Sequence, residues 1–189
     1  LAQETIKTIK AGNTADDAIT MVFARKTLGS TLVSDRKFKE ADVVFEEMRQ
    51  GIEKQGAVKN KIPATDLDWV IAMLKVGKST GALEMTQEML SAVSKQSNFS
   101  ESRLNYLQAF HAMSLRAASK ETEAREMYRK VMPALIDRVR NDAENQTGSN
   151  KQQERTVLIL EDNISMLAKQ FQSQPQARQL AAEAFSLAD

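Results

Sequence analysis

The 189-residue chain contains no cysteine, one histidine, three prolines and seven glycines, and aromatic residues make up only 5% of it. The absence of cysteine excludes disulfides, thiolate metal sites and a cysteine nucleophile. The single histidine, His111, excludes a metal site built from several histidines, although one would suffice for a Ser-His-Asp arrangement. The residue types that dominate, Ala, Leu, Met, Glu, Gln, Lys and Arg, favour helices. We therefore expect an all-α protein.

Neither sign of charge is in excess, because 26 Lys and Arg residues oppose 25 Asp and Glu residues, for a formal net charge of +1. A nucleic-acid surface needs clustered, unopposed cations, so we expect no nucleic-acid partner. No apolar run approaches the roughly 18 residues of a membrane span, and the start carries no signal-peptide pattern. We expect a cytoplasmic protein without a membrane partner. Because the chain begins at Leu1, we also expect it to be part of a longer protein.

The chain repeats a pattern of two helices joined by a short polar turn, and two markers keep one period. The leucine that closes each first helix recurs in steps of 42 and 41 residues, at Leu32, Leu74 and Leu115. The alanine that opens each second helix recurs in steps of 41 and 42 residues, at Ala41, Ala82 and Ala124. The predicted units cover residues 14–57, 62–97, 100–140 and 152–189, with a polar loop over 141–153. All four units are expected to form one helical repeat domain.

The letters "GKST" at residues 77–80 are those with which a phosphate-binding loop ends. Such a loop needs an earlier glycine where Ala72 stands, and it follows a strand, whereas this segment follows a predicted helix. We interpret "KVGKST" as the turn between the two helices of the second unit. Gly77 is expected to end the first of those helices as a left-handed cap.

The first unit combines large and small residues at a characteristic spacing: Leu28, Gly29, Leu32, Ala41 and Phe45. This spacing resembles that of the tetratricopeptide repeat. The two small residues would let the paired helices approach closely, with the aromatic ring beside them. The third unit repeats the pattern at Ala112, Leu115, Ala124 and Tyr128, whereas the second has Ile71 for the small residue and Thr86 for the aromatic. The resemblance implies a right-handed α-solenoid of about four antiparallel helix pairs, with a period longer than the ~34 residues usual for this repeat.

Long helix pairs, a polar insertion, "VLILEDNISMLAKQF" and the closing "AAEAFSLAD" together resemble the helical region that precedes the caspase-like CHAT protease domain in bacterial proteins. The resemblance covers residues 15–189. That family's catalytic His and Cys have no counterpart in this sequence. The resemblance therefore implies a non-catalytic arm that regulates a protease domain following Asp189.

Candidate catalytic residues are few. His111 lies between Phe110 and Ala112 on a repeat helix, and we interpret it as structural. "SDRK" at residues 34–37 has a Ser-x-x-Lys spacing but falls in a polar turn. We expect no enzymatic activity, no cofactor and no metal. A hydrolase built on His111 and an NTPase built on Lys78 are the alternatives.

In stacked helix pairs the first helices line the concave side, so their outward stripe predicts a partner-binding groove. The predicted groove residues are Phe23, Lys26, Ser30, Asp68, Trp69, Lys75, Tyr106, Phe110, Met113 and Arg116. The three large aromatic residues Trp69, Phe110 and Tyr106 are expected to anchor a partner. The three cations are expected to steer an acidic segment.

Some repeat proteins of this kind hold a C-terminal carboxylate between a lysine and an asparagine. Lys26 is suitably placed for this, but Ser30 replaces the asparagine and Tyr106 replaces a cation, so no two-carboxylate clamp is predicted. We expect a non-catalytic interaction or regulatory module whose partner is a protein, through a peptide or a helix. The alternative is an intramolecular regulatory role.

Overall fold

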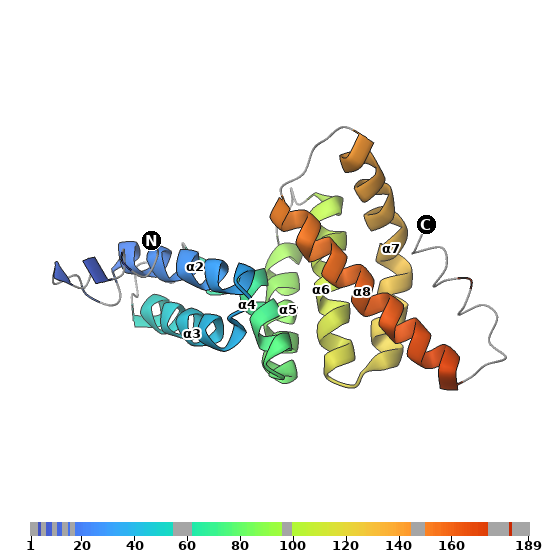
Figure 1. Ribbon diagram of the computed structural model, residues 1–189, viewed down its shortest axis with the longest axis horizontal. Helices are drawn as coiled ribbons and strands as arrows, with labels where there is room; N and C mark the ends of the chain where they lie inside the picture. Colours follow the sequence, from blue (N-terminus) through green and yellow to red (C-terminus); the bar gives the residue numbers. More distant parts are fainter. Residues whose placement is uncertain are drawn as a thin grey trace. The chain divides into compact units, whose positions relative to one another are not determined.

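The structure is a computed structural model that describes residues 4, 7, 8, 11, 12, 15, 18–54, 62–95, 100–144, 150–173 and 182. These residues form helices and turns and no β-strand, which confirms the all-α prediction (Figure 1). The helices are α2 (Ile19–Ser34), α3 (Phe38–Lys54), α4 (Leu67–Lys75), α5 (Ser79–Ser94), α6 (Glu101–Ala117), α7 (Glu121–Glu144) and α8 (Asn150–Ser173). None of the helices in these ranges combines the length and the apolarity that crossing a bilayer requires.

The chain divides into two compact units, Leu1–Glu88 and Met89–Asp189, with the boundary inside α5. In the first unit, α2 and α3 form a helix pair, and α4 packs against both. In the second unit, α6 and α7 form a pair, and α8 crosses both of its helices (Figure 1). Each unit therefore contains one helix pair covered by a further helix.

The turns after α2, α4 and α6 have the same backbone cap. Each has one residue at positive φ, at Arg36 (59°), Gly77 (82°) and Ser119 (62°). The N–H of the next residue, a lysine in every case, donates to a carbonyl five residues earlier. These bonds join Lys37 to Leu32, Lys78 to Met73 and Lys120 to Leu115, at 2.8, 2.8 and 2.9 Å. This is the Schellman cap, in which the bond satisfies a carbonyl that the helix end leaves without a partner. The predicted left-handed cap at Gly77 is confirmed.

These caps set a register for the three helix-turn-helix segments α2–α3, α4–α5 and α6–α7 that differs from the predicted one. The capped carbonyls belong to Leu32, Met73 and Leu115, in steps of 41 and 42 residues, so Met73 and not Leu74 is the matching position. The next helix confirms this register, because Ala41, Ala82 and Ala124 each donate to the lysine four residues earlier. One residue turns a side chain by about 100° around a helix. The predicted outward face of the second pair is therefore displaced by that angle.

At one buried position in each helix-turn-helix segment, a residue of the first helix and a residue of the second differ in size. A methyl group at Gly29 would lie 2.8 Å from two ring carbons of Phe45, so α2 and α3 approach where glycine leaves space. The matching positions hold Val70 on α4 and Thr86 on α5, and Ala112 on α6 and Tyr128 on α7. Where the first helix carries a larger residue, the second carries a smaller one. All six residues are buried. The summed volume of the two residues is therefore similar in the three segments, although the residue types differ.

The fourth predicted unit is described only in its first part. Residues at both ends of the predicted polar loop over 141–153 are helical, because α7 continues to Glu144 and α8 begins at Asn150. The second helix expected after Ser173 lies outside the described residues, apart from residue 182.

Candidate functional site

Lys78 and Ser34, which were considered for catalysis, form hydrogen bonds within the helical fold. The Lys78 ammonium donates to the Asp42 carboxylate (Nζ to Oδ2, 2.6 Å), and Asp42 is itself buried. The Ser34 hydroxyl donates to the Ser30 carbonyl at 3.2 Å. Among the described residues, no three His, Asp or Glu side chains come close enough together to hold a metal ion. Lys78 therefore serves to join the turn before α5 to α3.

His111 is partly buried on α6, and this burial has a consequence for stability. Burial is the largest influence on the His111 imidazole and lowers its pKa, while Glu123 raises the pKa and Lys120 lowers it. The unfolded chain then binds more protons than the folded chain at pH values just below the ordinary histidine pKa of about 6.5. The contribution of His111 to the free energy of unfolding is complete above that value and is lost as the pH falls from it through the lowered pKa of the folded chain.

We expect the variant His111→Gln to show a weaker decline of stability between about pH 7.5 and 5.5 than the parent chain. The measurement is the urea midpoint, followed by far-UV circular dichroism across this range. A parallel decline in both proteins would contradict the assignment.

Four of the predicted groove residues are buried, which corrects the expectation that they contact a partner. These are Asp68, Trp69, Phe110 and Met113. Trp69 packs in the core of the first unit, where its ring stacks on Phe45 with centroids 5.9 Å apart. Its Nε1–H donates to Oδ1 of Asp42 at 2.9 Å. Phe110 is also a core residue, and the half-buried Tyr106 meets it edge to face at 5.4 Å between centroids.

The displaced register explains the error at Asp68 and Trp69. With the correct step of 41 residues, the positions that match Phe23 and Lys26 are Ala64 and Leu67. Trp69 matches Leu28, a core residue of α2. The three lysines that follow the caps carry the signal that could have set the register correctly, because they recur at the exact steps of the turns.

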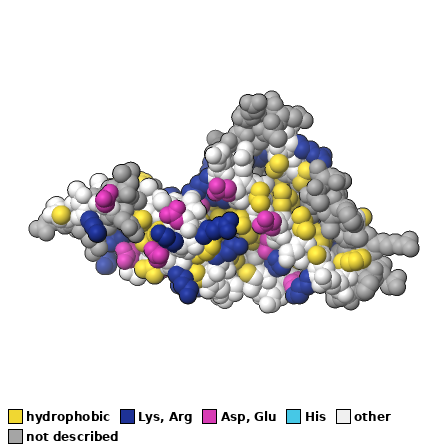
Figure 2. Space-filling model, in the orientation of Figure 1, with side chains coloured by type: hydrophobic (Ala, Val, Ile, Leu, Met, Phe, Trp, Pro, Cys, Tyr) yellow, Lys and Arg dark blue, Asp and Glu magenta, His cyan; other side chains and the backbone are white. Residues whose placement is uncertain are grey.

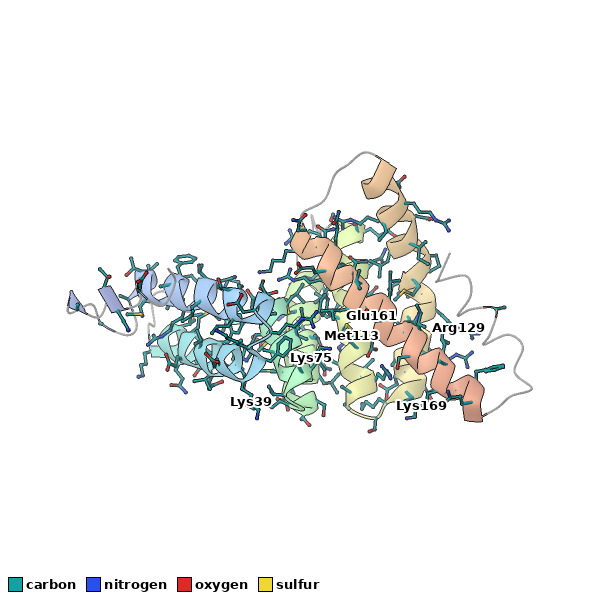
Figure 3. The ribbon with its side chains drawn as sticks, viewed as in Figure 1. Lys39, Lys75, Met113, Arg129, Glu161 and Lys169 are labelled. Atoms are coloured by element: carbon teal, nitrogen blue, oxygen red, sulfur yellow. The ribbon has the colours of Figure 1, made fainter. Side chains whose placement is uncertain are left out.

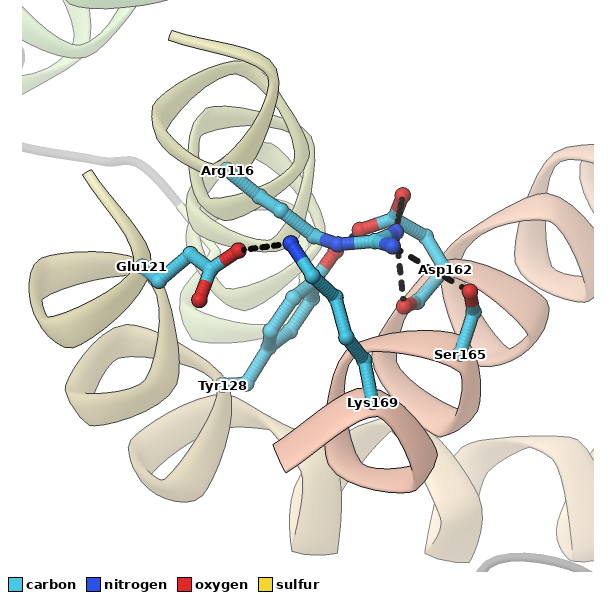
Figure 4. A network of polar contacts seen from close by, with 6 residues as sticks. All are labelled: Arg116, Glu121, Tyr128, Asp162, Ser165 and Lys169. Carbon is cyan, nitrogen blue, oxygen red and sulfur yellow. Dashed lines mark hydrogen bonds and ion pairs between the residues drawn. The ribbon is translucent and has the colours of Figure 1, made fainter. Parts of the chain in front are cut away.

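Arg116 was predicted to steer a partner, but it binds α8 within the second unit (Figure 4). Its guanidinium donates to the side chain and to the backbone carbonyl of Asp162, and to the Ser165 hydroxyl at 3.1 Å. The Tyr128 hydroxyl donates to the other Asp162 oxygen at 2.8 Å. Burial, then the Asp162 charge and this hydrogen bond, raise the pKa of Tyr128 well above its ordinary value. Asp162 thus joins α8 to α6 and α7 together.

A second ion pair joins α8 to the start of α7. Lys169 donates to Glu121 at 2.9 Å, which lowers the pKa of the Glu121 carboxyl (Figure 4). The lysine is 69% exposed and the glutamate 38%, so solvent screens this pair and it contributes little to stability.

The remaining predicted cations differ in their surroundings. Lys26 forms an ion pair with Asp66 at 3.2 Å. Lys75 is exposed and forms no ion pair with a described residue. On the face shown in Figure 2, cations and acids are interspersed rather than separated by sign. Two of the three predicted cations, Lys26 and Arg116, thus form ion pairs with acids of this chain.

The outer face of α2 retains two predicted groove residues and is uncharged. We call it the α2 surface, made up of Ile19, Phe23, Thr27, Ser30, Thr31 and Ser34. Ile19 is 46% exposed and Phe23 is 51% exposed. Three of the hydroxyl groups donate to carbonyls one turn earlier in the same helix. The donors are Thr27, Thr31 and Ser34.

The charged residues of α2 are neutralised beside this surface. Arg25 is buried and pairs with Glu47 at 3.2 Å, and Lys26 pairs with Asp66. The helix thus has an apolar side in the core and an uncharged side toward solvent. Two of the six residues on the solvent side are apolar and four carry hydroxyl groups.

No family model, curated protein or solved structure matches the chain, so the functional argument rests on the residues themselves.

Proposed function

We propose that the chain is a non-catalytic protein-interaction module that binds a partner helix on the α2 surface. The observation that carries this proposal is the exposed, uncharged side of α2, on which Phe23 is half exposed. Large exposed aromatic residues are frequent anchors of protein interfaces. The contact area belongs to the first unit alone.

The chemistry of the α2 surface favours a helix over an extended peptide. Its hydroxyl groups on Thr27, Thr31 and Ser34 already donate within their own helix. An extended peptide needs hydrogen-bond partners for its backbone, and this surface offers few. A helix satisfies its own backbone, and its apolar side can pack closely on small Ser and Thr side chains. The preferred partner is therefore an amphipathic helix with a hydrophobic side.

We also propose that the helix pairs are tetratricopeptide-type repeats arranged as a solenoid. Support comes from the three identical caps and from the steps of 41 and 42 residues between them. The buried Gly29–Phe45 level adds to this support, because a close approach of paired helices is what the repeat's small residues permit. Proteins of this architecture use the exposed faces of their helices for binding.

The α2 surface can be tested with a displayed library of amphipathic helical peptides, selected on the immobilised chain. We expect Phe23→Glu to weaken the best selected peptide by about 30-fold or more, the loss of a typical interface anchor. Val43→Glu is the matched control, because Val43 is 57% exposed on α3 but lies outside the α2 surface. Fluorescence anisotropy with a labelled peptide gives both affinities.

Equal losses in the two variants would contradict the assignment to the α2 surface, and so would a library that yields no helical peptide. If the parent gene encodes a caspase-like domain beyond Asp189, that domain is the first protein to assay against the same two variants.

A further inference from the structure

A cavity of about 430 Å³ lies between α7 and α8 of the second unit. Apolar side chains from both helices form part of its wall, among them Met132, Ile136 and Leu167. Pro133 also lines it and interrupts the backbone hydrogen bonds of α7 there, since proline has no N–H. The volume is within the range of cavities that bind small molecules or short peptide segments.

The polar lining of this cavity is predominantly cationic. Its lining includes the three arginines Arg125, Arg129 and Arg140 and one acid, Asp137. All three arginines come from one side of α7, and Figure 3 places Arg129 close to where α8 crosses that helix. The fifteen-residue interval from Arg125 to Arg140 spans about 22 Å along a helix at about 1.5 Å per residue. The charge and the length favour an elongated anion.

Asn163 on α8 also lines the cavity and provides independent evidence for a ligand. Only 3% of the residue is exposed. Within the described part of the chain, its amide makes no hydrogen bond. Neither atom of this amide is fully enclosed by the protein, so a ligand in the cavity can reach and pair with it.

We propose that this cavity binds an acidic peptide segment in an extended conformation, with one large apolar side chain between its acidic residues. The arginines bind the carboxylates, and the apolar wall receives the central side chain. The Asn163 amide pairs with a backbone peptide group of the ligand. About 22 Å corresponds to six or seven residues of extended chain at about 3.3 Å each.

The amide distinguishes a peptide from a simple anion. An asparagine side chain offers both a donor and an acceptor, and a backbone peptide group of the ligand offers the matching acceptor and donor. A carboxylate or a phosphate offers acceptors only and would leave the Asn163 carbonyl without a donor. Arginine clusters are a common means of recognising acidic peptide motifs. This site lies in the second unit and does not depend on the α2 surface.

The test uses a fluorescein-labelled seven-residue peptide, Asp-Glu-Ala-Phe-Ala-Glu-Asp, and fluorescence anisotropy with the full chain. We expect saturable binding that Arg140→Glu weakens at least tenfold and Asn163→Leu weakens at least fivefold. Lys130→Glu is the matched control, since it reverses one exposed charge on the same helix outside the cavity. A peptide with Ala in place of Phe should also bind at least fivefold more weakly.

Several results would overturn the proposal. Equal losses from Arg140→Glu and Lys130→Glu would indicate attraction by overall charge. Displacement of the peptide by inorganic phosphate at equal concentration, with no effect of Asn163→Leu, would indicate a site for small anions only. An absence of saturable binding would exclude the site. Phe23→Glu should leave the affinity for this peptide unchanged, which distinguishes the cavity between α7 and α8 from the α2 surface. Circular dichroism verifies that each variant is folded.

Discussion

Replacing Asp162 with alanine is expected to lower the stability of the second unit by about 2–3 kcal/mol, because the change leaves two donors without their acceptor. Arg116 and Tyr128 both donate to the Asp162 carboxylate, and the tyrosine hydroxyl lies on an almost fully buried side chain. Hydrogen exchange of the α8 amides measures this loss locally, so that it is not mixed with the stability of the first unit.

Two variants give the scale for this prediction. Lys169→Ala removes the exposed ion pair with Glu121 and should cost less than about 0.5 kcal/mol. Asp162→Asn keeps an acceptor oxygen while removing the charge, so it should fall between the two. If Asp162→Ala were as mild as Lys169→Ala, the attachment of α8 to α6 and α7 through Asp162 would be wrong.

Gly29→Ala is expected to destabilise the first unit by about 2–3 kcal/mol, although alanine is the better helix former by about 1 kcal/mol. The added methyl group would lie 2.8 Å from the Phe45 ring, which cannot move freely because it stacks on Trp69. Trp69 is the single tryptophan of the chain, so its fluorescence during urea unfolding reports on this packing directly.

Gly81→Ala is the control for Gly29→Ala. A methyl group at Gly81 would meet only the flexible Met73 side chain, at 3.4 Å from its sulfur. The gain in helix propensity should then prevail and stabilise the protein by up to about 1 kcal/mol. Opposite signs for the two variants are expected. If both substitutions changed the free energy of unfolding in the same direction, the close approach of α2 and α3 would not contribute measurably to stability.

The helical class and the turn at Gly77 could be predicted because each depends on local chemistry. Scarce glycine and proline leave long helical segments, and a glycine between two amphipathic patterns favours a left-handed cap. The exact register was harder to predict. Met73 and Leu74 are both apolar, so hydrophobic periodicity alone cannot decide which of them matches Leu32 and Leu115. That single residue moved Trp69 from the core, where it belongs, to a predicted binding face.

The packing of α8 against α6 and α7 could not be predicted from the sequence, for a different reason. Arg116 and Asp162 are 46 residues apart, and neither residue has a sequence signature that identifies the other as its partner. A cation at the end of α6 is equally compatible with a partner protein and with another helix of the same chain. The α2 surface was found in part, through Phe23 and Ser30. Its uncharged character depends on ion pairs and hydroxyl contacts that only the structure shows.

The most direct test of the proposed function is a hydrogen-exchange footprint of the full chain with the best helical peptide bound. We predict slower exchange in fragments covering Ile19–Ser34, and unchanged exchange in α3 around Val43. Protection confined to other helices, with Ile19–Ser34 unchanged, would contradict the proposal that α2 is the binding surface.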